Sequence, residues 1–247
     1  MTDSSRPVAV ISGGAKRVGA VIAETLCEAG YDLAISYRHS HDAALALAAR
    51  CEALRPRSCL ILPLDLADGA ALAPFIERVA AHYGRIDALI NNASSFYPTP
   101  LAQATPAQWE ELFATNARAP FFLAQAAAPH LARSRGCILN LIDIYGERPL
   151  PQHPIYSMAK AALAMMTLAL ARDLGPQVRV NGIAPGAVLW PESGKAEIER
   201  RELLARTPLA RAGEPSDIAR TALFLLRDAP YISGEIIRVD GGRALSI

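Results

Sequence analysis

The feature that most constrains the fold of this chain is a regular alternation of short apolar runs with longer helical stretches. The runs expected to form strands are Val8–Ser12, Leu33–Tyr37, Ser58–Leu64, Ile86–Asn91, Cys137–Ile142, Val178–Ile183 and Glu235–Asp240. The stretches expected to form helices are the one ending at Ala29, Asp42–Leu54, Gly69–Tyr83, Pro106–Arg133 with an interruption at Pro120, Ile155–Leu174 and Pro215–Leu226. This alternation predicts an α/β fold: a doubly wound parallel sheet flanked by helices.

One domain accounts for the whole sequence. The chain has 247 residues, which suits one α/β domain with a large core, and no repeat or low-complexity segment divides it. We therefore expect residues 1–247 to form a single domain, with residues 1–6 as a flexible N-terminal tail.

Composition excludes several classes of partner. Lysine plus arginine (25) nearly balances aspartate plus glutamate (24), which removes the electrostatic case for nucleic acid. No apolar run reaches the roughly 18 to 20 residues of a membrane span, and the N-terminus lacks the apolar segment of a secretory signal. No metal-ligand spacing occurs among the cysteines, so we expect free thiols and a cytoplasmic protein without a metal; they are Cys27, Cys51, Cys59 and Cys137.

Two stretches do not fit regular structure, Ala93–Thr105 and Gly186–Thr207. Both follow strands, and ligands of open parallel sheets bind beyond the carboxyl ends of strands, so both should rim the site. Residues 187–207 are long enough to act as a substrate loop or lid. Within them, Trp190 either closes over a substrate or packs the loop against the domain.

A glycine-rich turn, Ser12–Gly19, joins the first strand to the first helix. Glycines let the backbone approach a pyrophosphate, which then meets the positive end of the helix. Gly13, Gly14 and Gly19 are present, while the usual middle glycine position holds Arg17. A cation is poorly placed at this positive end unless an anion is present, which favours a bound phosphate or an electron-rich ligand. The alternatives are a plain strand-to-helix turn and a solvated arginine.

The end of the second strand indicates which dinucleotide binds. A carboxylate there binds the ribose 2′-hydroxyl of NAD, whereas a basic residue suits the 2′-phosphate of NADP. The chain reads Tyr37, Arg38, His39 and Ser40, with no acidic residue before Asp42. This favours NADP; the alternative is that the basic residues only cap the following helix on its solvent side.

Tyr156 and Lys160 stand four residues apart in an expected helix, and Asp143 lies upstream of them. Positions i and i+4 share one helix face, so the phenol and the ammonium can share a site. Since a nearby cation favours the tyrosinate, the pair can act as an acid or base nearer neutral pH than free tyrosine.

Together these motifs resemble the short-chain dehydrogenase/reductase family, and the match runs from about residue 7 to the closing Val239–Gly242. It is carried by the turn with Gly13 and Gly19, Asp65-Leu66, Asn91-Asn92-Ala93, Asn116, Tyr156 with Lys160, and Pro185-Gly186. The resemblance implies a single Rossmann-type sheet and an oxidoreductase.

Within that family the chain is similar to pteridine reductases. The narrower resemblance rests on Ala15–Gly19, on Asn91–Leu101 and on Asp143, where most of the family has serine. It implies NADPH as cofactor, a pterin or folate substrate and a homotetramer. Apolar helical surfaces at Gln108–His130 and Ile155–Leu174 also suggest burial between subunits.

The resemblance also implies roles for individual residues. Tyr156 would donate the proton, Lys160 would bind the nicotinamide ribose and lower the tyrosine pKa, and Asn116 would help to place a water near Lys160. The implied catalytic set is Asp143, Tyr156, Lys160 and Asn116. The implied cofactor contacts are Gly13, Arg17, Val18, Tyr37, Arg38, His39, Ser40, Asp65, Leu66, Asn92, Ala93, Ser94, Tyr156, Lys160, Pro185, Gly186 and Val188. The implied substrate contacts are Arg17, Ser94, Phe96, Asp143, Tyr156, Leu189 and Trp190, with Phe96 stacking on the pterin.

Asp143 separates two kinds of reduction. A ketone reductase must stabilise an oxyanion, which a serine hydroxyl can do and a carboxylate opposes. A pterin is reduced at C=N bonds, where nitrogen takes up a proton, and an anionic Asp143 would hold the Tyr156 phenol protonated. The alternative for Asp143 is an aspartate capping a turn before Gly146, and for Phe96 a small aromatic cluster with Tyr97.

The sequence therefore predicts NADPH-dependent reduction of dihydropterins to tetrahydropterins, and does not separate pterins from dihydrofolate or settle whether oxidised pterins react. One alternative is a carbonyl or 3-oxoacyl reductase of the same family. A more distant one is a dinucleotide-binding sensor without catalysis, which an intact set of Asn116, Tyr156 and Lys160 disfavours.

Overall fold

A seven-stranded sheet forms the centre of the molecule, in a computed structural model that describes residues 6–188 and 197–246. The strand order is β3-β2-β1-β4-β5-β6-β7, and every pairing is parallel. The strands are β1 Val8–Ile11, β2 Asp32–Tyr37, β3 Cys59–Pro63, β4 Ala88–Asn91, β5 Cys137–Leu141, β6 Arg179–Pro185 and β7 Ile236–Val239. The predicted Rossmann-type parallel sheet is confirmed.

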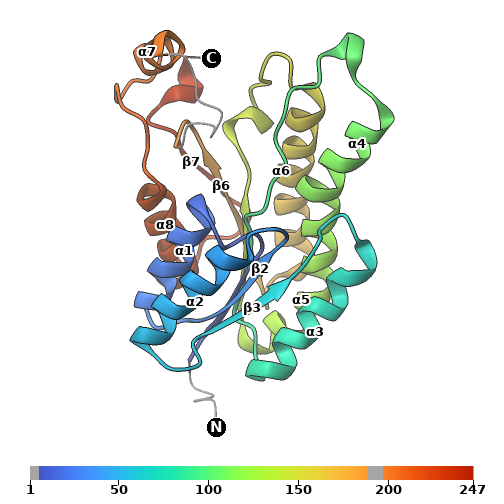
Figure 1. The fold of residues 1–247 in the computed structure, drawn as a ribbon, viewed down its shortest axis with the longest axis vertical. Coiled ribbons are helices and arrows are strands. Elements are labelled where there is room, and N and C mark those ends of the chain that lie inside the picture. The colour runs from blue at the N-terminus through green and yellow to red at the C-terminus, as the bar shows by residue number, and fades with distance from the viewer. Residues whose placement is uncertain (1–5, 189–196, 247) are drawn as a thin grey trace.

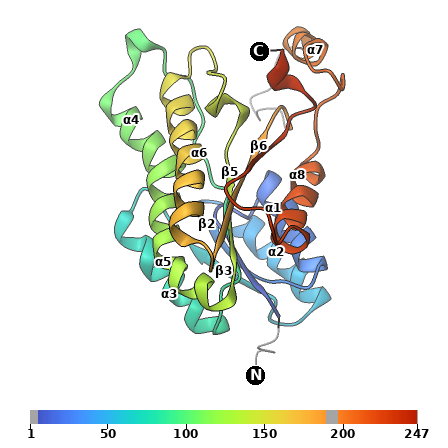
Figure 2. The ribbon, with the colours of Figure 1, turned by 180° about the vertical axis from the view of Figure 1, so that it is seen from behind.

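Helices cover both faces of the sheet. Those described are α1 Arg17–Glu28, α2 His41–Leu54, α3 Gly69–Tyr83, α4 Pro106–Phe113, α5 Ala119–Ser134, α6 Pro154–Leu174, α7 Glu197–Ala205 and α8 Pro215–Leu223. Helices α1, α2 and α8 lie on one face, and α3, α5 and α6 on the other, with α4 beside α6 (Figures 1 and 2). The direction of winding reverses at β1, so the loops that leave β1 and β4 open into one crevice.

Strand β1 shows how the two cores are divided. All four of its residues are buried, as expected for a central strand covered on both faces. Ala9 and Ile11 pack into the core under α1, α2 and α8, whereas Val8 and Val10 pack into the core under α3 and α5. Because side chains alternate along a strand, one short apolar run supplies both layers.

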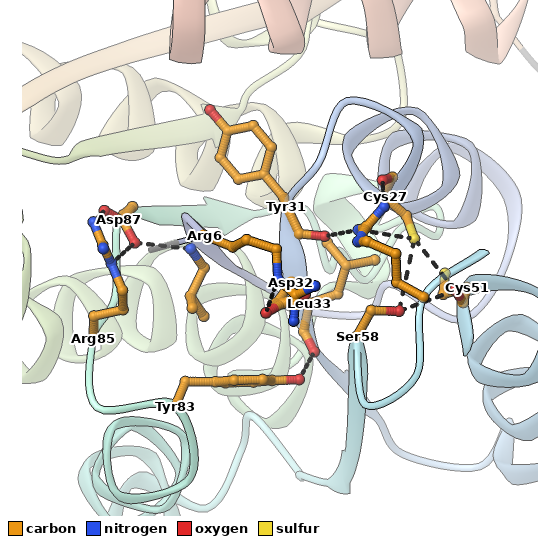
Figure 3. Close-up of polar contacts among 12 residues, drawn as sticks. Arg6, Cys27, Tyr31, Asp32, Leu33, Cys51, Ser58, Tyr83, Arg85 and Asp87 are labelled. Atoms are coloured by element: carbon orange, nitrogen blue, oxygen red, sulfur yellow. Dashed lines mark hydrogen bonds and ion pairs between the residues drawn. The ribbon is translucent and has the colours of Figure 1, made fainter. Parts of the chain in front are cut away.

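Ion pairs close the amino-terminal edge of the sheet, at the end opposite the β1 and β4 loops. Arg6 pairs with Asp32 at 3.2 Å, and Arg85 pairs with Asp87 at 2.6 Å (Figure 3). Asp87 also accepts a hydrogen bond from the backbone N–H of Val8. The cysteines, all buried and free, include Cys27, whose thiol lies near the carbonyl of Cys51 in the same view.

Two expectations about regular structure are wrong in part. The predicted helix Pro106–Arg133 is divided by a π-helical turn, Ala114–Arg118, and Pro120 lies in the first turn of α5 after it. Proline has no N–H to donate to the preceding turn, which suits this widened geometry. The stretch Gly186–Thr207 is predicted to lack regular structure, yet Glu197–Ala205 form helix α7.

Helix α6 is apolar enough to raise the question of a membrane. Among the described helices it alone has the length and hydropathy of a span, with a mean hydropathy of 1.3. It packs on β6 and buries Tyr156 and Lys160 inside the domain.

Candidate active site

The turn after β1 is tied to the loop after β4. The buried Ser12 hydroxyl accepts hydrogen bonds from the backbone N–H groups of Asn92 and Ala93 at 3.1 Å. The Asn92 amide donates to the carbonyls of Ser12 and Gly13 at 3.0 Å. A Cβ on Gly19 would stand 2.6 Å from the Asn92 amide nitrogen, so only glycine allows this approach. The Asn92 side chain therefore holds the turn, and Asn92 also borders the larger cavity, where its ribose contact stays a prediction.

Arg17 occupies a backbone position that favours glycine. Its φ is +55°, in the left-handed region, at the start of α1. This conformation costs a residue with a Cβ about 1 to 2 kcal/mol. Strained residues of this kind cluster at functional sites, and Arg17 borders the larger of the two cavities described below.

Two cavities meet at the turn. The larger, of about 460 Å³, is lined by Gly13, Lys16, Arg17, Val18, Gly19, Asn92, Ala93, Ser94, Phe96, Leu141, Ile142, Tyr156, Lys160, Pro185, Gly186 and Val188. The smaller, of about 160 Å³, is lined by Gly13, Ser36, Tyr37, Arg38, Leu64, Asp65, Leu66, Ala93, Ser94, Ser95 and Thr115. They share Gly13, Ala93 and Ser94, and two adjoining cavities beside a glycine turn fit a dinucleotide.

The smaller cavity gathers most of the residues expected at the adenosine end. Tyr37 and Arg38 border it, whereas His39 and Ser40 do not. His41 was not predicted, yet its Nδ1 lies 2.7 Å from the Tyr37 hydroxyl. No helix spans the two residues, so their spacing in the sequence gives no signal for that contact.

Asp143, Tyr156 and Lys160 are brought together beside the larger cavity, which Tyr156 and Lys160 border and Asp143 does not. The Tyr156 hydroxyl donates to Asp143 Oδ2 at 2.8 Å, and the other carboxylate oxygen accepts from the backbone N–H of Tyr145 at 3.0 Å. Lys160 Nζ donates to the carbonyl of Leu141 at 2.9 Å and lies 5.7 Å from the centre of the Tyr156 ring. The predicted sharing of one site by these three side chains is present.

The protonation of this group is governed first by burial. Burial raises the pKa of Tyr156 well above its usual value, and the neighbouring Asp143 carboxylate raises it further. Burial also raises the pKa of Asp143, although Tyr145, Tyr156 and Lys160 oppose the shift. Burial lowers the pKa of Lys160 to about 8, against the effect of Asp143. Asp143 therefore acts on the pKa of Tyr156 in the predicted direction, and a lowering of that pKa by Lys160 stays a prediction.

Asn116 lies in the π-helical turn and is fully buried. Its amide donates to the carbonyls of Ser95 and Leu112 at 2.9 Å, and its oxygen accepts from the Ser94 hydroxyl at 2.6 Å. The side chain thus fixes the loop after β4, and Ser94 links it to both cavities. Asn116 itself borders neither cavity.

Phe96 borders the larger cavity and is 49% exposed. Its ring is nearly perpendicular to that of Tyr156, with centres 4.8 Å apart. It also lies parallel to the imidazole of His153, at 4.8 Å and 9°. The His153 contact was not predicted, and no local sequence signal reveals it.

The remaining expected residues either border the larger cavity or lie outside the described residues. Pro185, Gly186, Val188 and Val18 border the larger cavity. Leu189 and Trp190 lie outside the described residues. Over the described part of the chain, no group of side chains has the composition of a metal site.

A parallel sheet with a glycine turn and a buried tyrosine–lysine pair at the same edge defines a class of nucleotide-dependent oxidoreductases, and sequence comparison makes the assignment specific. Residues 13–244 match a family model described as "Enoyl-(Acyl carrier protein) reductase". The chain belongs to the short-chain dehydrogenase/reductase family. It is an oxidoreductase of that family, whose members use NAD(P)H.

Relatives of two activities are about equally similar. The chain is 34% identical to pteridine reductase 1 of Leishmania tarentolae over 286 aligned residues, covering 99% of both chains. It is 33% identical to a 3-oxoacyl-[acyl-carrier-protein] reductase of Staphylococcus aureus over 238 residues, covering 95% of this chain and 96% of the relative. A Staphylococcus epidermidis enzyme of the same name is 32% identical. Overall identity does not choose between the two reactions.

Proposed function

We propose that this protein is an NADPH-dependent pteridine reductase, which reduces C=N bonds of dihydropterins to give tetrahydropterins. The observation that carries the proposal is the 2.8 Å hydrogen bond from the Tyr156 hydroxyl to Asp143. The position beside the tyrosine holds an acceptor, and a reductase of ketones needs a donor there for its oxyanion.

The three side chains can deliver a proton to a ring nitrogen. The raised pKa of Tyr156 keeps its phenol protonated at neutral pH, as a proton donor requires. Asp143, whose pKa is raised by burial, can take up and return a proton at the Tyr156 oxygen. Lys160, which donates to the Leu141 carbonyl, supplies positive charge beside both groups. A bound reduced nicotinamide would supply the hydride.

The larger cavity suits a flat heteroaromatic ring. Phe96 offers an aromatic ring beside Tyr156, and stacked rings attract one another beyond their burial. Arg17 and Ser94 border the same cavity and can donate hydrogen bonds to ring oxygen or nitrogen atoms. Leu189 and Trp190 remain proposed substrate contacts outside the described residues.

NADPH is the proposed cofactor. Arg38 borders the smaller cavity and lies just before α2, which begins at His41. Lys16 and Arg17 border the larger cavity at the start of α1. Cations at two helix N-termini suit the pyrophosphate and the 2′-phosphate. We propose in addition a cytoplasmic location and a homotetrameric assembly.

A second candidate is reduction of 3-oxoacyl thioesters. The 33% identity to the Staphylococcus aureus reductase over nearly the whole chain favours it. Asp143 counts against it, since a carboxylate beside Tyr156 repels the oxyanion that forms when a ketone accepts hydride.

Side-by-side kinetics separate the two. Purified protein with NADPH would be assayed for kcat/KM on dihydrobiopterin, dihydromonapterin, dihydrofolate and an acetoacetyl thioester. We expect turnover of at least one pterin to exceed that of the thioester by about a hundredfold or more, an effect of about 3 kcal/mol. The Asp143→Ser variant should lose pterin turnover and gain thioester turnover. Higher thioester turnover by the wild-type protein would establish the second candidate.

A further inference from the structure

The loop after β4 and the loop before α6 are joined beside the larger cavity. The backbone N–H of Thr99 donates to the carbonyl of Gln152 at 2.7 Å. Close to this bond, the rings of Phe96 and His153 lie parallel, with centres 4.8 Å apart and planes 9° apart. Two segments far apart in sequence are therefore fixed to one another by a backbone bond and a ring contact.

The backbone places His153 against Phe96 at a cost. Gln152 has a φ of +62°, in the left-handed region that disfavours a residue with a Cβ. His153 is the N-cap residue of α6, and its Nδ1 lies 2.8 Å from the carbonyl of Pro151. The backbone conformation of Gln152 and the contact of the His153 ring with the Pro151 carbonyl, which can only accept a hydrogen bond, together fix the imidazole.

His153 packs against one face of the Phe96 ring. Phe96 and Tyr156 border the larger cavity, while His153 does not. The phenyl ring is thus supported by the imidazole on one side and meets Tyr156 at 78° on another. An exposed phenyl ring on a loop has rotational freedom, and this support removes much of it.

We propose that His153 is a positioning residue for the substrate: its imidazole supports Phe96 so that the phenyl ring presents a fixed face to a planar heteroaromatic ring beside Tyr156. The inference rests on the proposed function, because a linear acyl chain gains nothing from a fixed aromatic face. It extends that function by assigning selectivity for planar rings to a residue that does not itself contact substrate.

The test compares His153→Ala with His153→Phe, which keeps a flat ring at the same position. Steady-state kinetics on the preferred dihydropterin would be measured together with NADPH affinity by fluorescence titration and the thermal midpoint of unfolding. For His153→Ala we expect KM to rise roughly two- to tenfold, the range that a lost aromatic pair gives. Turnover number and NADPH affinity should stay within about twofold, because Asp143, Tyr156 and Lys160 are untouched. The phenylalanine variant should recover most of the wild-type KM.

Three results would overturn this inference while leaving the proposed function standing. These are an unchanged KM in His153→Ala, an equal defect in His153→Phe, or a fall in NADPH affinity as large as the change in KM. The last result would mean that the histidine only supports the fold. A wild-type protein that turns over no pterin would instead remove the proposed function and this inference with it.

Discussion

At the scale of single residues, Arg17 combines a charged side chain that borders the larger cavity with a backbone conformation that favours glycine. The sequence has an arginine at the usual middle glycine position of the turn. In the structure this arginine has a φ of +55°, a backbone conformation that favours glycine. The sequence also predicts that Tyr156 and Lys160 share a site, because i and i+4 positions share a helix face. The directions in which the pKa values of Tyr156 and Lys160 shift could not be predicted from the sequence, since they depend on burial that only the folded chain defines.

Replacing Arg17 by glycine should separate stability from activity. Glycine removes about 1 to 2 kcal/mol of left-handed strain but adds about 0.5 to 1 kcal/mol of unfolded-chain entropy. Urea unfolding should therefore show stability unchanged or raised by up to about 1 kcal/mol. Pterin kcat/KM should fall about tenfold or more, as expected when a charged hydrogen bond is lost. Arg17→Lys, which keeps the charge, should lose less. Full activity in Arg17→Gly would show that the side chain takes no part in the reaction.

Lys160 should make stability depend on pH above neutrality. Its folded pKa of about 8 lies below its ordinary value of 10.5, so between these values the unfolded chain binds more protons than the folded one. Stability contributed by this lysine therefore rises as pH rises. Relative to Lys160→Met, the wild-type free energy of unfolding should increase by about 2 kcal/mol from about pH 7 to about pH 10.

The comparison of the wild-type protein with Lys160→Met also controls for other groups that titrate in this range. Cys27 and Cys137, whose pKa values burial raises to about 11, lower stability with rising pH in both proteins and cancel in the difference. A difference that stays constant across the range would mean that Lys160 keeps an ordinary pKa in the folded protein. Chemical denaturation at each pH gives the measurement.

At the scale of elements, a buried polar chain connects β4, β5 and α6. The Asn91 amide donates to Asn140 Oδ1 at 2.8 Å, and the Asn140 amide donates to the Thr167 hydroxyl at 2.9 Å. Thr167 in turn donates to the carbonyl of Leu163. Because α6 also carries Tyr156 and Lys160, the chain helps to set the helix against the sheet beneath the site.

Thr167→Val should weaken this connection without changing the shape of the side chain. The Asn140 amide would lose its acceptor in a buried position, which costs about 1 to 3 kcal/mol. Thr167→Ser keeps the hydroxyl and loses only a methyl group, so it should cost about 1 kcal/mol. Urea unfolding of the two variants checks the order. If serine proved as harmful as valine, packing and not the hydrogen bond would account for the loss.

The elements also show which parts of the fold the sequence could predict. All seven strands were found because buried parallel strands appear as short apolar runs. Helix α7, Glu197–Ala205, was missed because its strong helix formers carry no regular apolar face. The π-helical turn Ala114–Arg118 falls inside the predicted helical region Pro106–Arg133, ahead of the interruption expected at Pro120, because it keeps the helical pattern around it. The contact of His153 with Phe96 depends on how two loops pack, which no local pattern records.

At the scale of the whole molecule, the two sides of the sheet differ in how much apolar surface they expose. Helices α4, α5 and α6 lie together on one side (Figures 1 and 2). They carry six large apolar side chains that are each at least 41% exposed: Trp109, Phe121, Phe122, Met158, Met165 and Leu168. Apolar surface gathered in this way marks an interface more often than a free surface. A second copy of the same chain is the proposed occupant, within a homotetramer.

Charges placed in this surface should reduce the size of the assembly. Met165 and Leu168 are 64% and 43% exposed on α6, and Met165→Glu with Leu168→Glu would place two carboxylates in each copy of the interface. A two-fold interface brings the same residues from both subunits together, so like charges would meet there and oppose association. Light scattering after gel filtration should show four chains of 26.4 kDa for the wild-type protein and fewer for the variant.

Leu45→Glu on α2, on the opposite side of the sheet, is the matched control because Leu45 is also exposed, at 49%. It should leave the mass unchanged. A wild-type protein that is monomeric at micromolar concentration, or a double variant that keeps the wild-type mass, would assign this surface to something other than self-association.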